Sequence, residues 1–201
     1  FEITIVNNIM DYTMLKENEE KGDYKLYLFE NTRGSDCAFT FNITIEDENL
    51  REIFNNVKFR QAMSYALDRK TMNETLYYGK GDIRQATAAF NTSFMKEEFE
   101  NAYIEYDVDK ANALLDECGY EWNSSHTVRL MPNGQEFNIV LETIEEFAPT
   151  AEMACEYWNA VGIKVTLNQE ERSYYLERGQ NNQRQMQAFT MDSVGELLLR
   201  S

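Results

Sequence analysis

The sequence is poor in the residues that build disulfide frameworks and metal sites. It has three cysteines, Cys37, Cys118 and Cys155, which are far apart and form no CxxC pair. This odd number and wide spacing argue against a disulfide framework or a zinc site, so we expect three free thiols. The one histidine, His126, lies in the polar stretch NSSHTV, with no Cys or His nearby to share a metal ion. We therefore expect neither a metal site nor a cofactor.

Positive charge and long apolar runs are also scarce. The chain has 19 Lys and Arg against 35 Asp and Glu, which gives a net charge of -16. Nucleic acid or an anionic membrane would repel such a chain, so we expect no nucleic-acid partner. No apolar run approaches the length that crosses a bilayer, and the N-terminal stretch lacks the pattern of a secretory signal.

Signatures of catalysis are missing as well. The sequence contains no GxSxG, HExxH, P-loop or GxGxxG motif, and no Cys/His pair. Acid pairs such as Glu145 and Glu146 are abundant in so acidic a chain, so they carry little information. We expect no catalytic residue and a protein that is not an enzyme.

What the sequence does have is enough apolar material for a core. The 201 residues are 43% hydrophobic and 13% aromatic, which suits one domain or two small ones. The chain opens with FEITIV, residues 1–6, which is typical of a strand. A natural protein rarely begins inside a strand, so we expect this chain to be an internal piece of a longer one.

The hydrophobic periodicity predicts strands and helices in a mixed order. Strands are expected at 1–6, 24–30, 37–45, 163–169 and 184–191, with one or two more within 127–143. Helices are expected at 7–22, 106–120, 149–162, 173–180 and 193–201, with two more within 54–81 and a short one at 94–99. This order favours one α/β or α+β domain, in which helices flank a mixed sheet.

The most specific pattern is NNVKFRQAMSYALDRKTMNETLYYGKG, residues 55–81. Apolar residues recur there at helical spacing before and after Asp68, which predicts two helices with Asp68 as the cap of the second. The stretch resembles V-(R/K)-x-R-x-A-(I/L/M)-x-x-A-(I/L)-D-R in the family 5 extracellular solute-binding proteins. These are the oligopeptide-, dipeptide- and nickel-binding proteins of ABC importers. The residues that match are Val57, Arg60, Ala62, Ala66, Leu67, Asp68 and Arg69.

Three further stretches resemble the same family in the same order. They are YDVDKANALLDECGYEW, NGQEFNIVLET, and the long stretch from AEMACEYW through GIKVTLNQ to QAF. The resemblance covers residues 39–189. It implies an α/β lobe of the type II periplasmic-binding-protein kind, with residues 1–201 as a single C-terminal lobe cut from a larger two-lobed protein. Such a lobe closes over a ligand by a hinge motion.

The resemblance also implies partners and a location. The ligand would be a peptide or another small molecule held between this lobe and the missing N-terminal lobe of the same protein. The other partners would be ABC permease subunits. The full-length protein would be extracellular, either as a membrane-anchored lipoprotein or in the periplasm.

Seven residues fall at positions where family members meet their ligand. The strand CAFTFN places Phe39, Phe41 and Asn42 as candidates for the cleft, although a place in the core would explain the two phenylalanines equally well. Together with Tyr175, the two phenylalanines would make the open face of the lobe partly apolar. These positions are implied by the resemblance alone.

The other candidates lie in the last third of the chain. Glu171 stands where oligopeptide receptors often have an aromatic residue, and Arg178 matches a family Arg in the next helix. Met191 and Asp192 lie near the Trp and the Asp of a Trp-x-x-Asp motif whose Asp meets the ammonium of the ligand. These departures bring di- to pentapeptide specificity into question.

Two alternatives stay open. The sequons at Asn42, Asn73, Asn91 and Asn123 are compatible with a secreted interaction or adhesion module that has no role in transport. The departures from the family pattern are compatible with a binding lobe for a non-peptide ligand such as a nickel chelate.

Overall fold

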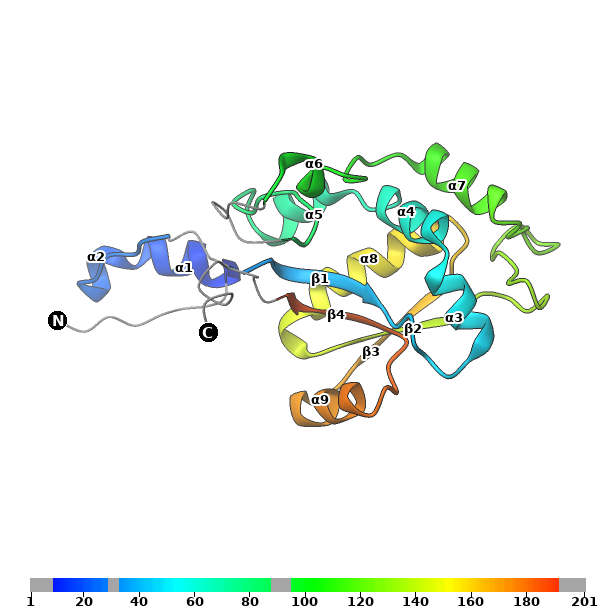
Figure 1. Cartoon of the computed structure of the whole chain (residues 1–201). Coiled ribbons are helices and arrows are strands. Elements are labelled where there is room, and N and C mark those ends of the chain that lie inside the picture. The colour runs from blue at the N-terminus through cyan, green and yellow to red at the C-terminus, as the bar shows by residue number, and fades with distance from the viewer. Residues whose placement is uncertain (1–8, 29–32, 88–94, 192–201) are drawn as a thin grey trace.

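A computed structural model describes residues 9–28, 33–87 and 95–191 of the chain (Figure 1). The strand expected at 1–6 and the helix expected at 193–201 lie outside the described residues. Within the described residues, four strands form one sheet in the order β1-β4-β2-β3. Their bounds are Ser35–Phe41 for β1, Ile139–Thr143 for β2, Val165–Gln169 for β3 and Met186–Met191 for β4.

The sheet is mixed, as predicted. β1 runs antiparallel to β4, whereas β2 runs parallel to both β3 and β4. The register places Phe41, Met186, Leu141 and Leu167 in one row across the four strands. Because successive residues point to opposite faces, the next row carries Thr40, Gln187, Glu142 and Asn168 on the other side. One face of the sheet is therefore apolar and the other polar.

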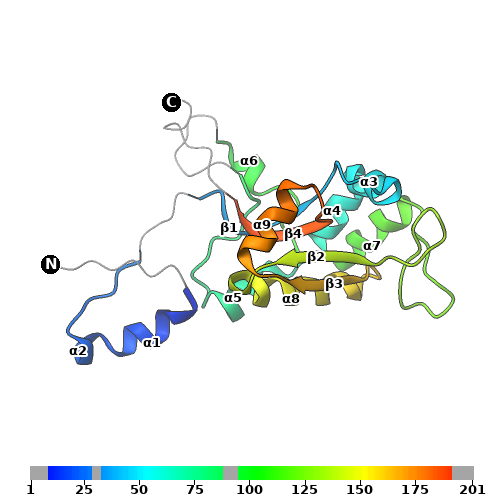
Figure 2. The same cartoon turned by 90° about the horizontal axis from the view of Figure 1, so that it is seen from below.

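Helices cover the two faces unequally. Among the described helices, α4, α5, α7 and α8 lie on the apolar face, whereas α9 lies against the polar face (Figures 1 and 2). The longer helices are α3 Glu48–Asn55, α4 Val57–Tyr65, α5 Arg69–Leu76, α7 Val108–Glu117, α8 Ala148–Ala160 and α9 Arg172–Gln180. Two short segments are α6 Glu97–Glu100 and the 3-10 helix η2 Glu145–Phe147. The sheet and the helices on its apolar face enclose the main core.

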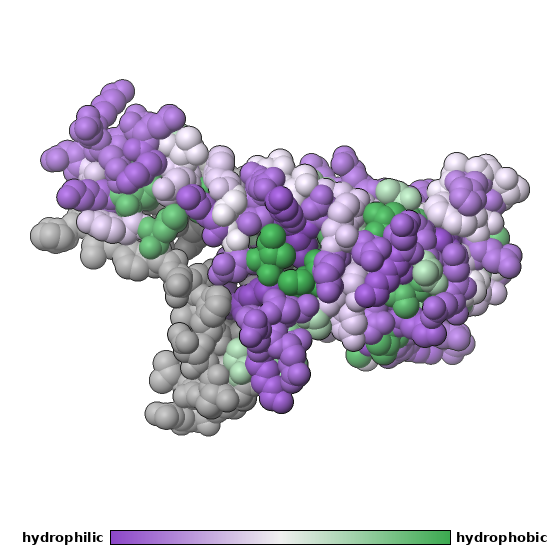
Figure 3. Space-filling view, turned by 90° about the horizontal axis from the view of Figure 1, so that it is seen from above, coloured by the Kyte–Doolittle hydropathy of each residue, from purple (hydrophilic) through white to green (hydrophobic). Residues whose placement is uncertain are grey.

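Aromatic side chains fill this core. Trp158 on α8 is 1% exposed and donates a hydrogen bond from Nε1 to the carbonyl oxygen of Met63 over 2.8 Å, so its one polar atom is satisfied. Phe59 is fully buried and stacks against Phe137 at 6.1 Å between ring centroids. Seen from above, the outside of the lobe is mostly hydrophilic, with hydrophobic residues in small separate groups (Figure 3).

Side-chain caps begin α5 and α7, and the cap of α5 is the one that the sequence predicts. Asp68 accepts a hydrogen bond from the backbone N–H of Thr71 at 3.0 Å and caps α5. Asp107 accepts one from the N–H of Lys110 at 2.8 Å and caps α7. The helix α3 was not predicted, although Asp47 caps it and its buried residues Leu50, Ile53 and Phe54 have helical spacing.

Two predictions near the start of the chain are wrong. Residues 24–28 form no strand, and the single helix expected at 7–22 is three short pieces, η1 Ile9–Asp11, α1 Tyr12–Glu17 and α2 Glu19–Gly22. Neither α1 nor α2 has a buried residue, and both lie apart from the sheet in Figure 1. Among the described residues, no side chain of α1 or α2 therefore belongs to the main core.

The region 127–143 contributes one strand, not two. Only 139–143 joins the sheet, and the preceding residues form isolated bridges from Trp122 to Arg129 and from Leu130 to Glu136. Gly134, at a φ of 81°, makes the turn that separates these segments. The first strand is likewise shorter than expected and ends at Phe41.

Candidate functional site

The parallel strands β2, β3 and β4 end at the same edge of the sheet. In open α/β sheets, ligands bind outside the carboxyl ends of parallel strands. The residues that follow or end these strands are 144–147, 170–174 and 189–191, and we call them the carboxyl edge. Residue 35, where β1 begins, pairs with residue 191 and so lies at the same edge.

Exposed carboxylates dominate the charge of the carboxyl edge. Glu145 and Glu146 follow β2, and Glu171 follows β3. The nearby cation is Arg172, whose Nη1 lies 3.9 Å from an oxygen of Glu146 and whose guanidinium lies 5.6 Å from the ring centroid of Phe189. An edge with three exposed carboxylates and one exposed guanidinium favours a positively charged group on a ligand.

Beneath these charges lies a small apolar cluster that is separate from the main core. Ile144, Phe147 and Tyr175 are its buried members, and Phe189 packs against them. Phe189 contacts Phe147 edge to face at 5.3 Å and stacks on Tyr175 at 5.1 Å. This cluster forms a layer of packed aromatic side chains beneath the charged residues of the carboxyl edge.

Glu171 and Met191 lie at the carboxyl edge. Glu171 caps α9, because its carboxylate accepts hydrogen bonds from the N–H groups of Ser173 at 2.9 Å and Tyr174 at 3.3 Å. The hydroxyl of Ser173 donates to the same carboxylate, and these bonds lower the pKa of Glu171. Met191 ends β4 and is 42% exposed. Asp192 lies outside the described residues.

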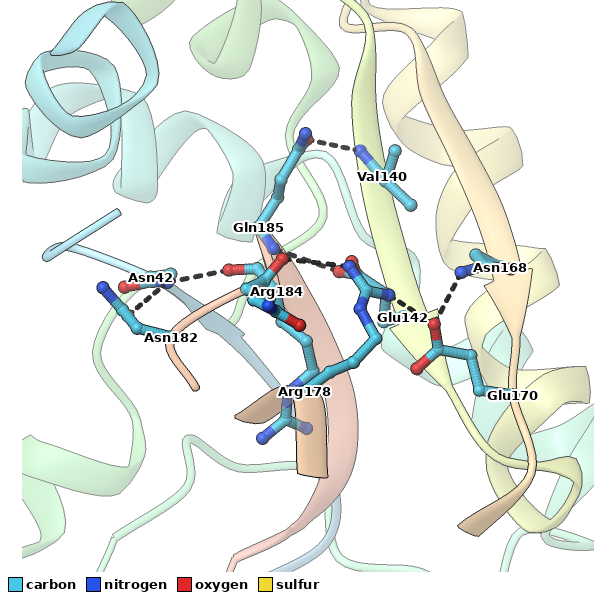
Figure 4. A network of polar contacts seen from close by, with 10 residues as sticks. Asn42, Val140, Glu142, Asn168, Glu170, Arg178, Asn182, Arg184 and Gln185 are labelled. Carbon is cyan, nitrogen blue, oxygen red and sulfur yellow. Dashed lines mark hydrogen bonds and ion pairs between the residues drawn. The ribbon is translucent and has the colours of Figure 1, made fainter. Parts of the chain in front are cut away.

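Arg178 lies on α9, which covers the polar face of the sheet (Figure 2), and its side chain extends toward Glu142 and Glu170 (Figure 4). Its guanidinium pairs with Glu142 at 3.0 Å, pairs with Glu170, and donates to the carbonyl oxygen of Gln183 at 2.9 Å. Burial raises the pKa of Glu142, which is 1% exposed, although Arg178 and the backbone N–H of Gln185 act in the opposite direction. The charge of Arg178 is therefore already paired with carboxylates of the same chain.

Asn42 lies at the opposite end of the β1–β4 ladder from Met191. Its Nδ2 donates to the carbonyl oxygen of Arg184 at 2.7 Å and to Oδ1 of Asn182 at 2.8 Å. The Nδ2 of Asn182 in turn donates to the carbonyl oxygen of Thr44 at 3.0 Å. These contacts join the end of β1 to the turn before β4, beside a shallow pocket of about 210 Å³.

Phe39 and Phe41 pack against the main core. Phe39 meets Trp158 edge to face at 5.1 Å, and Phe41 meets Phe59 at 5.6 Å. This is the core alternative that the sequence left open. The expectation that Tyr175 belongs to an open apolar face is wrong, because it is 1% exposed and its hydroxyl donates to Gln187 at 3.0 Å.

The three cysteines are free thiols in the structure. Burial raises the pKa of Cys37 to about 12 and that of Cys155 to about 11. Among residues 9–28, 33–87 and 95–191, no group of three or more His, Cys, Asp or Glu could hold a metal ion. In that same part of the chain, no helix is both long and apolar enough to cross a membrane.

The chain matches a family model described as bacterial extracellular solute-binding proteins, family 5 Middle, over residues 2–195. It is 27% identical over 187 residues to the heme-binding protein A of Haemophilus influenzae, which is 90% of this chain and 30% of that protein. It is 29% identical over 140 residues to the dipeptide-binding protein of Escherichia coli K12, which is 69% of this chain and 25% of that protein.

A solved structure of the oligopeptide-binding protein OppA superposes with a TM-score of 0.84 at 34% identity. The match covers 94% of this chain and 30% of that one. The chain thus spans less than a third of the length of each of these three proteins. The agreement in fold confirms the α/β lobe, with a mixed sheet flanked by helices, that the sequence predicts.

Proposed function

The chain belongs to the bacterial extracellular solute-binding proteins of family 5, and we propose that it is one lobe of a two-lobed receptor that captures a peptide for an ABC importer. The observation that carries the proposal is the family match over residues 2–195. The second lobe is supplied by the rest of a longer chain, and the ligand lies between the lobes. The proposed role is binding, without catalysis.

The carboxyl edge is the part of this lobe that faces the ligand. Its exposed carboxylates, Glu145, Glu146 and Glu171, suit the ammonium group of a peptide or a basic side chain. The exposed side chains of Tyr174 and Met191, 55% and 42% exposed, offer apolar contact beside them. Asp192 follows Met191 directly and would add a further carboxylate for the ammonium.

Two relatives support peptides as the ligand. The dipeptide-binding protein and the oligopeptide-binding protein are both named for such ligands. Family members with this role deliver their ligand to permease subunits at the outer side of the cytoplasmic membrane. We therefore place the full-length receptor on that side, either in the periplasm or held by a lipid anchor.

A non-peptide ligand is the second candidate. The relative that matches 90% of this chain is named for heme, and this chain has Glu171 and Met191 where peptide receptors often carry aromatic residues. Heme or a metal chelate is therefore the competitor to test.

The test is titration calorimetry on a longer receptor that contains this lobe and its second lobe. We expect di- and oligopeptides with a free amino terminus to bind one to one, and we expect N-acetylation of the same peptides to weaken binding. Heme and a nickel chelate serve as the competing ligands. Binding of either one, with no binding of any peptide, would overturn the proposal.

A further inference from the structure

We propose, on the basis of the function proposed above, that Arg178 is a positioning residue that fixes α9 and thereby holds Glu171 and Tyr174 in place at the carboxyl edge. The resemblance to the family places Arg178 at a ligand-contact position. The geometry points instead to a structural tie, in which Arg178 contacts Glu142, Glu170 and the carbonyl oxygen of Gln183. We call these three contacts the clamp.

The clamp joins segments that are far apart in the sequence. Arg178 stands near the C-terminal end of α9, and its guanidinium reaches Glu142 on β2 and Glu170 just after β3 (Figure 4). It also donates to the carbonyl oxygen of Gln183, in the turn that leads into β4. One side chain thus ties α9 to the ends of two strands and to the start of a third.

The partners of Arg178 are themselves held in place. The second carboxylate oxygen of Glu142 accepts a hydrogen bond from the N–H of Gln185 at 3.1 Å. Glu170 accepts one from Nδ2 of Asn168 at 2.9 Å. Both carboxylates are buried, at 1% and 5% side-chain exposure. A planar guanidinium that is paired twice and donates to a carbonyl oxygen has little room to swing toward a ligand.

The position of the clamp relative to the edge explains its effect. Glu170 is the residue before Glu171, which caps α9, and α9 carries Arg178 less than two turns beyond Tyr174. Fixing Glu170 and Arg178 against each other therefore closes a small loop around the first turn of α9. Without the ion pair between Arg178 and Glu170, Glu171 and Tyr174 lose their fixed orientation toward the ligand.

The chain offers a matched control at the other end of the lobe. Arg129 is also a buried arginine, and it pairs with Asp116 at 2.6 Å. It lies before β2 and beside Gly162, at the amino ends of the parallel strands, and so away from the carboxyl edge. Replacing it removes a comparable buried charge without touching the proposed site.

The experiment compares Arg178→Met and Arg129→Met in the longer receptor by calorimetry with one peptide in two forms, the free acid and the C-terminal amide. We expect Arg178→Met to weaken both forms by the same factor, on the order of tenfold, which is the scale of partners that orient a binding group from behind. We expect Arg129→Met to leave both affinities unchanged. Arg178→Lys, which keeps the charge but lacks the fork, should weaken both forms equally but less.

Two results would overturn the proposal. A loss that occurs for the free acid and vanishes for the amide would mean that Arg178 contacts the ligand carboxylate directly. Unchanged affinity for both forms in the Arg178→Met receptor would mean that the clamp does not matter for binding. If Arg178→Met fails to fold, Glu142→Gln replaces it, because it weakens the contact between Arg178 and Glu142 without removing the guanidinium. The same two results in that variant would overturn the proposal.

A second measurement separates this proposal from the proposed function. Amide hydrogen exchange on the chain itself needs no ligand, so it is informative even if the receptor binds no peptide. We expect Arg178→Met to speed exchange at residues 172–176 more than in the rest of the sheet and helices, and we expect Arg129→Met to show no such local excess. Unchanged exchange in that first part of α9 would show that Arg178 does not position it.

Discussion

Arg129 is 1% exposed, and the surrounding residues account for the burial of its guanidinium. Its guanidinium donates to the carbonyl oxygens of Tyr120 at 2.6 Å and Val161 at 3.0 Å, and to Asn112 at 2.9 Å. The ring of Trp122 lies 4.7 Å from the guanidinium carbon. Buried polar groups are tolerated only when they are hydrogen-bonded in this way. Arg129 therefore fastens the loop after α7 to the end of α8.

Arg129→Met should destabilise the fold by about 2 kcal/mol or more, because it leaves buried carbonyl oxygens without a donor. Urea denaturation of the chain measures the change. Asp116→Asn is the control, since Asp116 is 65% exposed and its pairing should contribute less than about 1 kcal/mol. Equal losses in the two variants would contradict the assignment of the main role to the carbonyl contacts.

Glu142 makes a prediction about pH. Burial raises its pKa above the ordinary value of 4.5, against the pull of Arg178 and the N–H of Gln185, and the neighbouring carboxylate of Glu170 raises it further. A raised pKa in the folded state means that the contribution of this group to stability is complete below pH 4.5. That contribution is lost as the pH rises through the raised value.

Glu142→Gln should therefore change stability in a pH-dependent way. Near pH 4 the variant should lack the stability that protonated Glu142 contributes to the wild type. As the pH rises toward neutrality the wild type loses this contribution, so the stability of the variant should rise relative to that of the wild type. Denaturation of both proteins across this range gives the difference in unfolding free energy. A difference that stays constant with pH would contradict the raised pKa.

At the scale of elements, the helices were the more predictable part of the fold. An N-cap and an apolar stripe are local signals, so Asp68 marks the start of α5 as predicted, and the helix expected at 106–120 contains α7. The same signals are present for α3, with Asp47 before Leu50 and Ile53, so this helix is also predictable from its own residues.

Strands were harder, because a strand exists only where it has a partner. Residues 24–28 alternate as a strand should, yet they form none in the structure. The stretch before β2 also alternates, but Arg129 turns inward to bind carbonyl oxygens, and only isolated bridges result. Pairing of this kind depends on residues far away in the sequence, which periodicity cannot show.

The candidate site was predictable only in part, for the same reason. The strands expected at 163–169 and 184–191 end at the same residues as β3 and β4, so the positions of Glu171 and Met191 relative to these strands followed from the sequence. Their contact with a ligand stays a prediction. The sequence could not show that Arg178 meets Glu142, since 36 residues separate them. Nor could it show that Asn42 lies at the far end of the ladder, because that depends on the antiparallel register with β4.

The cap of α5 gives a test at this scale. Asp68→Ala should cost about 1 kcal/mol of stability, because the N–H of Thr71 loses its acceptor at the start of the helix. Chemical denaturation would measure the loss. Asp109 is exposed in the first turn of α7 and does not cap it, so Asp109→Ala should cost less than about 0.5 kcal/mol. A cost for Asp68→Ala as small as that of the control would contradict the capping role.

At the scale of the whole molecule, half a cleft should bind poorly. In the proposed receptor, one lobe supplies only part of the contacts to the ligand, whereas association still costs on the order of 4–15 kcal/mol of lost motional freedom. We therefore expect this chain alone to bind peptides no more tightly than about millimolar. Calorimetry of the 201-residue chain against a peptide library and nickel chelates tests this. One-to-one binding at micromolar affinity would mean that the lobe holds a complete site.

The antiparallel pairing of β1 with β4 also determines how the lobe responds to mechanical tension. Residue 35 at the start of β1 lies opposite residue 191 at the end of β4, so both chain connections leave the sheet side by side. A pull that separates these two connections acts across the ladder and breaks its hydrogen bonds one at a time from that end. A pull along two strands would instead load many bonds at once. In a force experiment held at these two points, the lobe should open like a zipper at low force, beginning at Ser35 and Met191.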